Sequence, residues 1–334
     1  MTMRATALAN PNIAFIKYWG IRDEALRLPA NDSLSMTIGP LATRTSVEFD
    51  FHRTQDALIL NSEVVSGPSL SRMQGFMDQL RKKAGQSIYA LVISDNNFPT
   101  SSGLASSASA YAALTLAGTT ALGLELSEPE LSSLARFGSG SASRSIPGGY
   151  VTWETDTPSN SSFATSFAAP EHWRLCDCIA IISTAHKAVS SQEGMLNARS
   201  SPFQTARIAD TPRRLAICKQ AVLERDFDTL AKVIEQDSNM MHAVMMTADP
   251  PLFYWHRRSL ALMKAVKTWQ GEGLPVTYTL DAGPNVHVIC PQTVAGKIID
   301  RLQNFPGVQE VIQAFPAGPA RLIHEDSQVT SPQV

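Results

Sequence analysis

The sequence predicts an α+β fold in two halves, and two observations carry this prediction. Alternating apolar and polar residues, typical of strands, dominate residues 5–94, helical spacing dominates residues 196–270, and strand patterns return over residues 277–315. A doubly wound fold would instead alternate strands and helices along the whole chain. In addition, 334 residues are enough for two domains that share a cleft. We place these domains at residues 1–172 and 173–334.

The first half is expected to hold most of the strands. The apolar run 5–16, interrupted at Asn10, Pro11 and Asn12, predicts a strand, a bend and a short helical or extended segment. A polar loop at 22–30 and a surface excursion at the Ser-rich stretch 158–170, near the domain boundary, are also expected. Periodicity predicts further strands at 33–38, 43–51, 88–94 and 151–154, and a hairpin at 57–65. It also predicts three helices, at 69–84, 110–122 and 128–137.

The second half is expected to be mainly helical. A buried strand at 178–183 comes first. Helices are predicted at 196–207, 212–223, 227–246, 251–270 and 294–304. Strands at 277–280 and 286–290 flank a turn at residues 281–285, and a last strand is predicted at 308–315.

The composition is that of a soluble globular protein. A net charge of −2 gives no electrostatic reason to expect nucleic acid or an anionic membrane as a partner. No apolar run approaches the ~18 residues that a membrane span needs, and residues 1–12 do not resemble a signal peptide. The cysteines form no pattern typical of zinc ligands, so reduced thiols in a cytoplasmic protein are expected at Cys176, Cys178, Cys218 and Cys290.

One stretch combines loop-forming and small residues with the start of an Ala-rich helix. Such a backbone can approach a ligand closely and present the unpaired N–H groups of a helix N-terminus to a phosphate. A capped, buried helix without any ligand is an equally good interpretation of this stretch alone. The residues in question are Asn97, Pro99, Ser101, Ser102, Gly103, Leu104, Ala105, Ser106, Ser107 and Ser109.

Three further segments carry polar residues in unusual settings. Lys17 beside Tyr18 and Trp19 suits an anion or a carboxylate partner, although a snorkelling lysine explains the spacing better. Arg144, in a loop of small residues and hydroxyls at 139–149, suits a carboxylate or phosphate, with a solvated turn as the alternative. Asp281 opens the turn Asp-Ala-Gly-Pro-Asn and is a candidate general base, with an Asx turn as the alternative.

In this order, the four segments resemble the GHMP kinase superfamily and, within it, the diphosphomevalonate decarboxylase group. The segments 12–20, 97–109, 139–149 and 281–285 match the group's motifs, and Asn239–His242 and Tyr254 also fit. The resemblance implies a two-domain GHMP kinase fold with the active site in the cleft between the domains, and a homodimer. The implied chemistry is phosphorylation of a tertiary 3-hydroxyl by ATP, followed by loss of phosphate and CO₂ to leave an alkene.

The resemblance also implies roles for individual residues. Asp281 would orient or deprotonate the hydroxyl, Lys17 would keep Asp281 ionised and steady the transferring phosphoryl group, and Arg144 would hold the substrate carboxylate. The stretch 97–109 would hold the ATP phosphates, with Ser106 or Ser107 near Mg²⁺. Substrate contacts are implied for Asn12, Tyr18, Trp19, Ser139, Ser141, Arg144, Lys187, Ser191 and Met195.

Two departures from the group bear on the substrate. Ile21 and Gln192 stand where the group typically carries Lys and Arg, both of which serve the substrate's diphosphate. Losing two charge-assisted contacts, each worth ~1.5–3 kcal/mol, favours a substrate with one phosphate. We therefore expect decarboxylation of 5-phosphomevalonate to isopentenyl phosphate. Three alternatives remain: Arg22 or Lys187 restores the charge and the diphosphate is the substrate, the enzyme is a kinase that does not decarboxylate, or the chain is a non-catalytic ATP-binding regulator.

Overall fold

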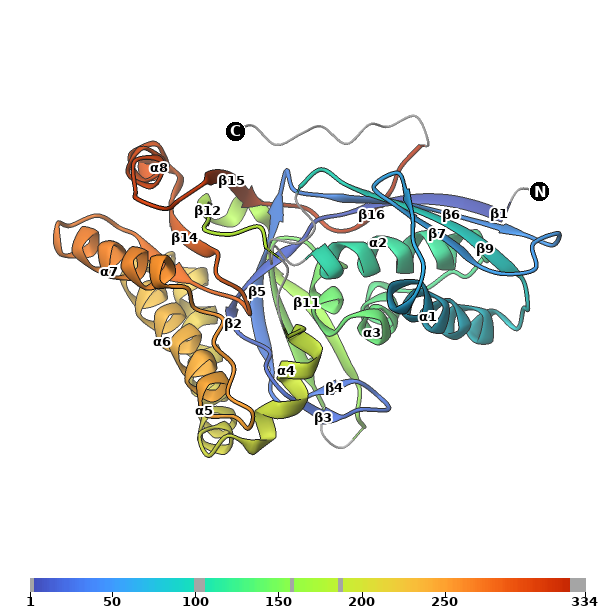
Figure 1. Ribbon diagram of the computed structural model, residues 1–334, viewed down its shortest axis with the longest axis horizontal. Coiled ribbons are helices and arrows are strands. Elements are labelled where there is room, and N and C mark those ends of the chain that lie inside the picture. The colour runs from blue at the N-terminus through green and yellow to red at the C-terminus, as the bar shows by residue number, and fades with distance from the viewer. Residues whose placement is uncertain (1–2, 99–105, 157–158, 186–188, 325–334) are drawn as a thin grey trace.

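The computed structural model describes residues 3–98, 106–156, 159–185 and 189–324. Its strands and helices form the expected α+β arrangement, with one sheet at the right of the view, the other through the middle, and helices α5 to α8 at the left (Figure 1). Both ends of the described chain lie on the same side in this view, since β1 and β16 are neighbours in one sheet.

The first sheet has six strands in the order β16-β1-β6-β9-β7-β8. Its strands are β1 (Met3–Ala9), β6 (Thr43–Asp50), β7 (Ala57–Leu60), β8 (Glu63–Val64), β9 (Tyr89–Asn96) and β16 (Arg321–Leu322). Three helices cover one face of this sheet: α1 (Pro68–Ala84), α2 (Ser106–Ala121) and α3 (Glu128–Gly138) (Figure 1). The small side chains of α2 allow close packing, and a Cβ atom on Gly118 would lie 2.5 Å from Leu80 Cδ1 of α1.

The second sheet has eight strands, in the order β11-β10-β5-β15-β12-β14-β13 with β2 also paired to β5. Its strands are β2 (Asn12–Ile16), β5 (Ser33–Gly39), β10 (Tyr150–Thr155), β11 (Ser162–Ala168), β12 (Leu175–Ile181), β13 (Thr277–Thr279), β14 (Val286–Pro291) and β15 (Glu310–Pro316). Ile38 and Gly39 of β5 pair with Pro316 and Phe315 of β15, so the two halves of the chain share this sheet. The division at residue 172 remains a prediction.

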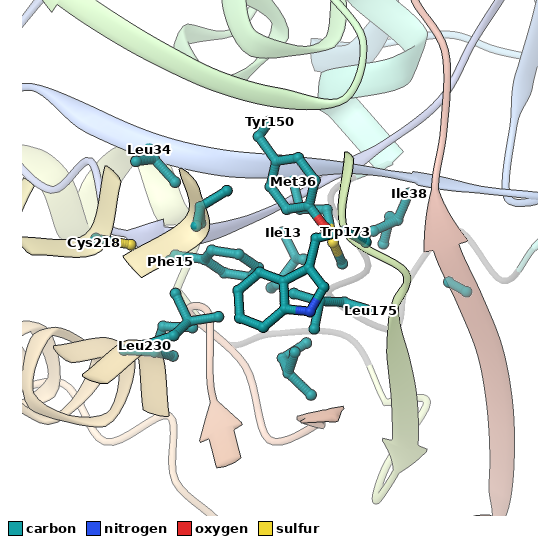
Figure 2. Packing of buried hydrophobic residues seen from close by; sticks show 14 of the residues in the cluster. Ile13, Phe15, Leu34, Met36, Ile38, Tyr150, Trp173, Leu175, Cys218 and Leu230 are labelled. Atoms are coloured by element: carbon teal, nitrogen blue, oxygen red, sulfur yellow. Dashed lines mark hydrogen bonds between the residues drawn. The ribbon is translucent and has the colours of Figure 1, made fainter. Parts of the chain in front are cut away.

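Helices lie on both faces of the C-terminal part of this sheet, because alternate residues of β12 point in opposite directions. Leu175, Ile179 and Ile181 pack toward α5 (Gln204–Glu224) and α6 (Phe227–Met246). Cys176, Cys178 and Ala180 pack toward α7 (Arg257–Gly271) and α8 (Ala295–Gln303). Figure 2 shows the first of these cores, where Phe15, Leu34 and Leu230 surround Trp173.

Two expected elements are wrong in detail. The stretch 158–170 contains the edge strand β11, in which the Ser162 hydroxyl is buried and accepts a bond from Trp153 Nε1 at 2.9 Å. The loop 22–30 contains most of a short antiparallel pair of strands, β3 (Ile21–Asp23) and β4 (Leu28–Pro29). The segment after Pro11, expected to be helical or extended, is extended and forms the strand β2.

The helices of the second half also differ from expectation. One helix, α5, continues through Pro212, because the buried side chains of Thr211 and Arg214 both donate to the carbonyl of Arg207 and hold the two parts of the helix together. The separate helix α4 (Ser191–Asn197) precedes it. Helix α7 begins at Arg257 and not at residue 251, because the His256 side chain caps it by accepting a bond from the N–H of Arg258. Within the ranges given above, no helix combines the length and apolarity that crossing a membrane requires.

Candidate active site

A pocket of about 680 Å³ collects residues from distant parts of the sequence. Its wall includes the chain after β2, the start of α2, the 3₁₀ turn at Gly140–Ser145, the N-terminal part of α4, and the turn after β13. All three of the expected catalytic residues line it: Lys17, Arg144 and Asp281. So do these expected substrate contacts: Asn12, Tyr18, Trp19, Ser139, Ser141, Ser191 and Met195.

Lys17 and Asp281 form an ion pair in which Lys17 Nζ lies 2.6 Å from Asp281 Oδ1. The lysine side chain is 2% exposed, whereas the carboxylate is 30% exposed and faces the pocket. Asn285 holds the end of the turn, since its Oδ1 accepts bonds from the N–H groups of Ile182 and Ser183. The geometry therefore places a cation directly beside the carboxylate that faces the pocket.

The backbone of Lys17 is held by buried polar side chains. Its N–H donates to Asp237 Oδ2 at 2.6 Å, and its carbonyl accepts bonds from Arg207 Nη2 at 2.6 Å and Asn31 Nδ2 at 3.0 Å. Arg214 Nε donates to the other oxygen of Asp237 at 2.9 Å. Because Arg207, Arg214 and Asp237 are all almost completely buried, the peptide that carries the lysine is fixed on both sides.

Arg144 is buried at the inner wall of the pocket. Its Nη1 donates to Ser33 Oγ at 2.8 Å and its Nε to Asn12 Oδ1 at 3.2 Å. Asn12 is itself oriented, because its amide donates to the carbonyl of Ser141 and to Ser145 Oγ. Burial lowers the pKa of Arg144 to about 10, which still leaves the guanidinium charged near neutral pH and able to bind a carboxylate.

Tyr18 and Trp19 form an aromatic wall. The Tyr18 ring packs edge-on against Trp153, with ring centroids 4.9 Å apart, and lies so close to Gly140 that a Cβ atom there would be 2.7 Å from Tyr18 Cε1. Burial raises the pKa of Tyr18 to about 12, so its hydroxyl is neutral near pH 7. Met195 packs beside both aromatic residues. This part of the pocket is therefore apolar and poorly accessible to water.

Hydroxyl groups line another part of the pocket wall. Ser107 Oγ lies 3.3 Å from Ser139 Oγ, which lies 3.3 Å from Ser141 Oγ. Ser106 and Ser107 also open α2, whose first turn contains no acidic residue. The N-terminus of a helix offers unpaired N–H groups and a partial positive charge, so this wall suits an anion.

Two residues of the expected phosphate-binding stretch do not line the pocket. Ser109 is fully buried and bonded to Thr43 Oγ1 at 2.6 Å, so we assign it to the packing of α2 on β6. Asn97 accepts a bond from the N–H of Ala42 and donates to the carbonyl of Pro40, so it braces the neighbouring loop. The other expected contacts lie outside the described residues: Pro99, Ser101, Ser102, Gly103, Leu104, Ala105 and Lys187.

Two arginines that the sequence analysis did not single out also line the pocket. Arg72 Nη2 donates to the carbonyl of Gly138 at 2.8 Å, and Arg27 Nη1 lies 3.5 Å from the same oxygen. Arg22, which was considered as a replacement charge, instead donates to Asn160 Oδ1. Arg27 lies between two short strands and Arg72 near the start of α1, and neither belongs to a local motif that could have identified it.

Two histidines, His242 and His287, are buried within the fold. His242 stacks on Trp255 with ring centroids 4.7 Å apart, and burial, together with the charge of Lys17, lowers its pKa to about 3. His287 bonds to Asp177 at 2.7 Å. Among residues 3–98, 106–156, 159–185 and 189–324, no group of three or more His, Cys, Asp or Glu side chains could hold a metal ion.

Comparisons with known proteins agree along nearly the whole chain. Residues 9–164 match a model of the diphosphomevalonate decarboxylase-like N-terminal domain, and residues 178–332 match one of the mevalonate 5-diphosphate decarboxylase C-terminal domain. A diphosphomevalonate decarboxylase of Ganoderma lucidum is 37% identical, with 93% of this chain and 84% of that protein covered. Its counterpart in Saccharomyces cerevisiae is 38% identical, with 85% of this chain and 77% of that protein covered.

Solved structures give the same result. The mevalonate diphosphate decarboxylase of Staphylococcus aureus matches with a TM-score of 0.92 and 39% identity, covering 97% of this chain and 99% of that one. A structure of MDDEF in complex with MVAPP, AMPPCP and magnesium matches with a TM-score of 0.91 and 36% identity, covering 97% and 99%. These names specify a diphosphate, so they do not support the monophosphate substrate and isopentenyl phosphate product expected from Ile21 and Gln192.

Proposed function

Because the chain belongs to the diphosphomevalonate decarboxylase family, we propose that it is the ATP-dependent carboxy-lyase of the mevalonate pathway that converts mevalonate 5-diphosphate to isopentenyl diphosphate. The observation that carries the proposal is the meeting of Lys17, Asp281 and Arg144 in one pocket. The diphosphate replaces the monophosphate as the proposed substrate, and the names of the relatives support this choice.

The charge distribution of the pocket also supports the diphosphate. Positions 21 and 192 do carry uncharged side chains at its wall, as the sequence analysis noted. However, Arg27 and Arg72 line the same pocket and lie within hydrogen-bonding range of one carbonyl. The positive charge missing at Ile21 and Gln192 is therefore supplied by residues at other positions.

The reacting end of the substrate lies beside Asp281 in this proposal. Asp281 accepts the proton of the 3-hydroxyl as the hydroxyl oxygen attacks the γ-phosphorus of ATP. The bond between the γ-phosphorus and the bridging oxygen breaks, and ADP leaves with the electron pair. Lys17 favours the ionised form of the carboxylate and stabilises the transferring phosphoryl group. The bond between C3 and the new phosphate oxygen then breaks, and phosphate leaves with the electron pair. The bond to the carboxylate carbon breaks next, its electrons form the alkene, and CO₂ is released.

Arg144 and the aromatic wall act on the later steps. Arg144 binds the substrate carboxylate before CO₂ forms, and its bonds to Asn12 and Ser33 fix the direction of the guanidinium. Positive charge develops at C3 as the phosphate departs. The rings of Tyr18 and Trp19 exclude water from that centre, which prevents its capture as an alcohol.

ATP and Mg²⁺ fit the hydroxyl-lined wall. The start of α2 offers the hydroxyls of Ser106 and Ser107 and the positive end of the helix to the phosphates, and Mg²⁺ would neutralise phosphate charge when bound. The structure of MDDEF with AMPPCP and magnesium supports this pair of ligands. The proposed contacts of residues 99–105 with ATP rest on the sequence motif.

Steady-state kinetics on two substrates test the proposal. We expect kcat/KM to be higher for mevalonate 5-diphosphate than for 5-phosphomevalonate, with one CO₂ released for each ADP. A higher value for the monophosphate contradicts the substrate assignment, and ADP formation without CO₂ identifies a kinase instead.

The quaternary state and compartment are also proposals. The resemblance implies a homodimer, which light scattering on the purified protein tests directly. The cysteines are unpaired and buried, at Cys176, Cys178, Cys218 and Cys290. Unpaired thiols suit the reducing cytoplasm, and fractionation of cells that express the protein tests this location.

A further inference from the structure

A small hairpin, formed by β3 and β4 and spanning residues 21–29, builds one wall of the pocket. Figure 1 shows it at the edge of the molecule beside α4. Ile21, which pairs with Pro29 across the hairpin, presents an apolar side chain to the pocket. Arg27, on the returning side of the turn, presents a guanidinium to the same pocket.

The backbone at Arg27 is held in an unusual conformation. Its φ of 50° lies in the left-handed region, which non-glycine residues seldom adopt. Leu28 and Pro29 directly after it are buried and fix the returning strand. The strained turn therefore directs Arg27 toward the pocket.

Arg27 and Arg72 approach one oxygen atom from different elements. Arg72 already satisfies the carbonyl of Gly138 at 2.8 Å and stacks over the Tyr111 ring at 5.0 Å, whereas Arg27 is 3.5 Å from that carbonyl. A guanidinium carries five N–H donors, so most donors of Arg27 have no protein acceptor within the described part of the chain. Ser139, which follows Gly138 in the chain, also lines the pocket, and its hydroxyl lies 3.3 Å from Ser107 Oγ.

The charges around Arg27 are not balanced by the protein. Neither Arg27 nor Arg72 takes part in an ion pair among the residues that the structure describes. Burial, together with the charge of Arg72, lowers the pKa of Arg27. Glu24, the acidic residue of the hairpin at the pocket, is 3.9 Å from Arg199. Two guanidiniums that meet without a carboxylate between them are stabilised when an anion binds there.

Capping of α3 is the alternative explanation for this pair. The C-terminus of a helix attracts cations, and Gly138 is the last residue of α3. Arg72 makes that contact with good geometry, so Arg27 at 3.5 Å adds little to it. The orientation of Arg27 toward the pocket is explained better by a ligand.

We propose that Arg27 binds the terminal phosphate of the substrate and determines the preference for the diphosphate over the monophosphate. This inference rests on the proposed function. In related enzymes the resemblance places a lysine at position 21, and we assign the role of that positive charge to Arg27. Ile21 and Arg27 lie on the two sides of the hairpin and face the same pocket, so a cation at either position can reach a phosphate there.

Substitution of Arg27 separates binding from chemistry. Arg27→Met keeps the length of the side chain, and we expect it to raise KM for mevalonate 5-diphosphate about tenfold or more while kcat changes less than about twofold. KM for 5-phosphomevalonate and KM for ATP should change by less than about twofold. In Arg27→Lys, KM for mevalonate 5-diphosphate should rise less than in Arg27→Met. The double variant Ile21→Lys/Arg27→Met should also have a lower KM than Arg27→Met alone.

Arg22→Met is the matched control on the same hairpin. Its guanidinium points away from the pocket to Asn160, 3.0 Å distant, so we expect no change in KM beyond about twofold. An equal effect of Arg22→Met and Arg27→Met would mean that only the long-range charge matters, and it would overturn the assignment. So would an unchanged KM for the diphosphate in Arg27→Met, or a rise confined to KM for ATP.

Inhibition by inorganic pyrophosphate, competing with the substrate, distinguishes this inference from the proposed function. The inhibition constant should rise about tenfold in Arg27→Met if Arg27 binds the phosphate. A wild-type enzyme that prefers the monophosphate refutes the proposed function, yet a rise in this constant would still support phosphate binding by Arg27. An unchanged constant refutes the inference whichever substrate the wild-type enzyme prefers.

Discussion

The two ends of the pocket are built differently. At the reacting end, Lys17 is almost completely buried, its side chain is paired with Asp281, and both sides of its peptide are bonded. At the hairpin end, Arg27 is half-buried and Arg72 is exposed, and they converge on a single carbonyl. The reacting end is therefore ordered by the protein itself, whereas the hairpin end keeps unused donors for a ligand.

This difference indicates where each kind of specificity resides. Catalysis requires groups held in position before the substrate arrives, since reorganisation during the reaction raises the barrier. Recognition of a mobile phosphate tolerates a looser arrangement and can be achieved from several positions. Substitutions at the reacting end should consequently act on kcat or on folding, and those at the hairpin end on KM.

The largest effect is expected at Asp281. Asp281→Asn keeps the shape of the side chain but removes the proton acceptor, so kcat for ADP release should fall by about 10²–10⁴-fold. KM should change much less, because the 30% exposed carboxylate is one contact among many in the pocket. As a control, thermal melts followed by circular dichroism should give the same Tm for Asp281→Asn and the wild type. If Asp281→Asn releases ADP at the wild-type rate, Asp281 has no part in the mechanism.

The network behind Lys17 gives the next largest effect. Asp237→Ala leaves Arg207 and Arg214 buried without their shared carboxylate, so the free energy of unfolding should fall by about 3–5 kcal/mol. Asp210→Ala is the matched control, since Asp210 also pairs with Arg214, at 2.6 Å, but is partly exposed. That change should lower the free energy by about 1 kcal/mol or less. Similar losses for the two variants in urea titrations would show that burial of the network does not matter.

His242 makes the reacting end sensitive to acid. The folded state keeps this ring neutral down to its pKa of about 3, whereas the unfolded chain takes up the proton near pH 6.5. Between these values the unfolded state binds more protons, so the stabilisation present above pH 6.5 is lost progressively as the pH falls toward 3. In urea titrations, the free energy of unfolding of the wild type should fall relative to that of His242→Phe as the pH is lowered from 6.5 toward 3. Parallel pH profiles would exclude His242 as the cause.

The sequence predicted the reacting end better than the hairpin end. Lys17, Arg144 and Asp281 stand in short segments whose residue types suggest chemistry, and all three line the pocket. Asp237 lies in the middle of α6 and Arg207 in the first turn of α5, and a charged residue in a long helix normally indicates a solvated face. Their contacts with Lys17 join positions 220 and 190 residues apart, and no local pattern records such a pairing.

The same limit applies to the substrate prediction. An expected charge that is missing from a motif, as at Ile21, is visible in a sequence, but a compensating charge elsewhere is not. The hairpin brings Arg27 to the pocket, and α1 brings Arg72 to Gly138, so both positions depend on the fold and not on a local motif. Counting charges within the motif therefore underestimated the positive charge of the pocket.

The smallest effect is expected at Arg72, and it completes the comparison. Arg72→Met removes one charge-assisted contact with a bound anion, so KM for the phosphorylated ligands should rise about tenfold while kcat stays within about threefold. The loss of its contacts with Gly138 and Tyr111 should lower the free energy of unfolding by about 1 kcal/mol. Initial rates measured while ATP and then the substrate is varied show whether Arg72→Met raises KM for ATP, KM for the substrate, or both. A large fall in kcat at unchanged KM would place Arg72 with the reacting end and remove the distinction between the two ends of the pocket.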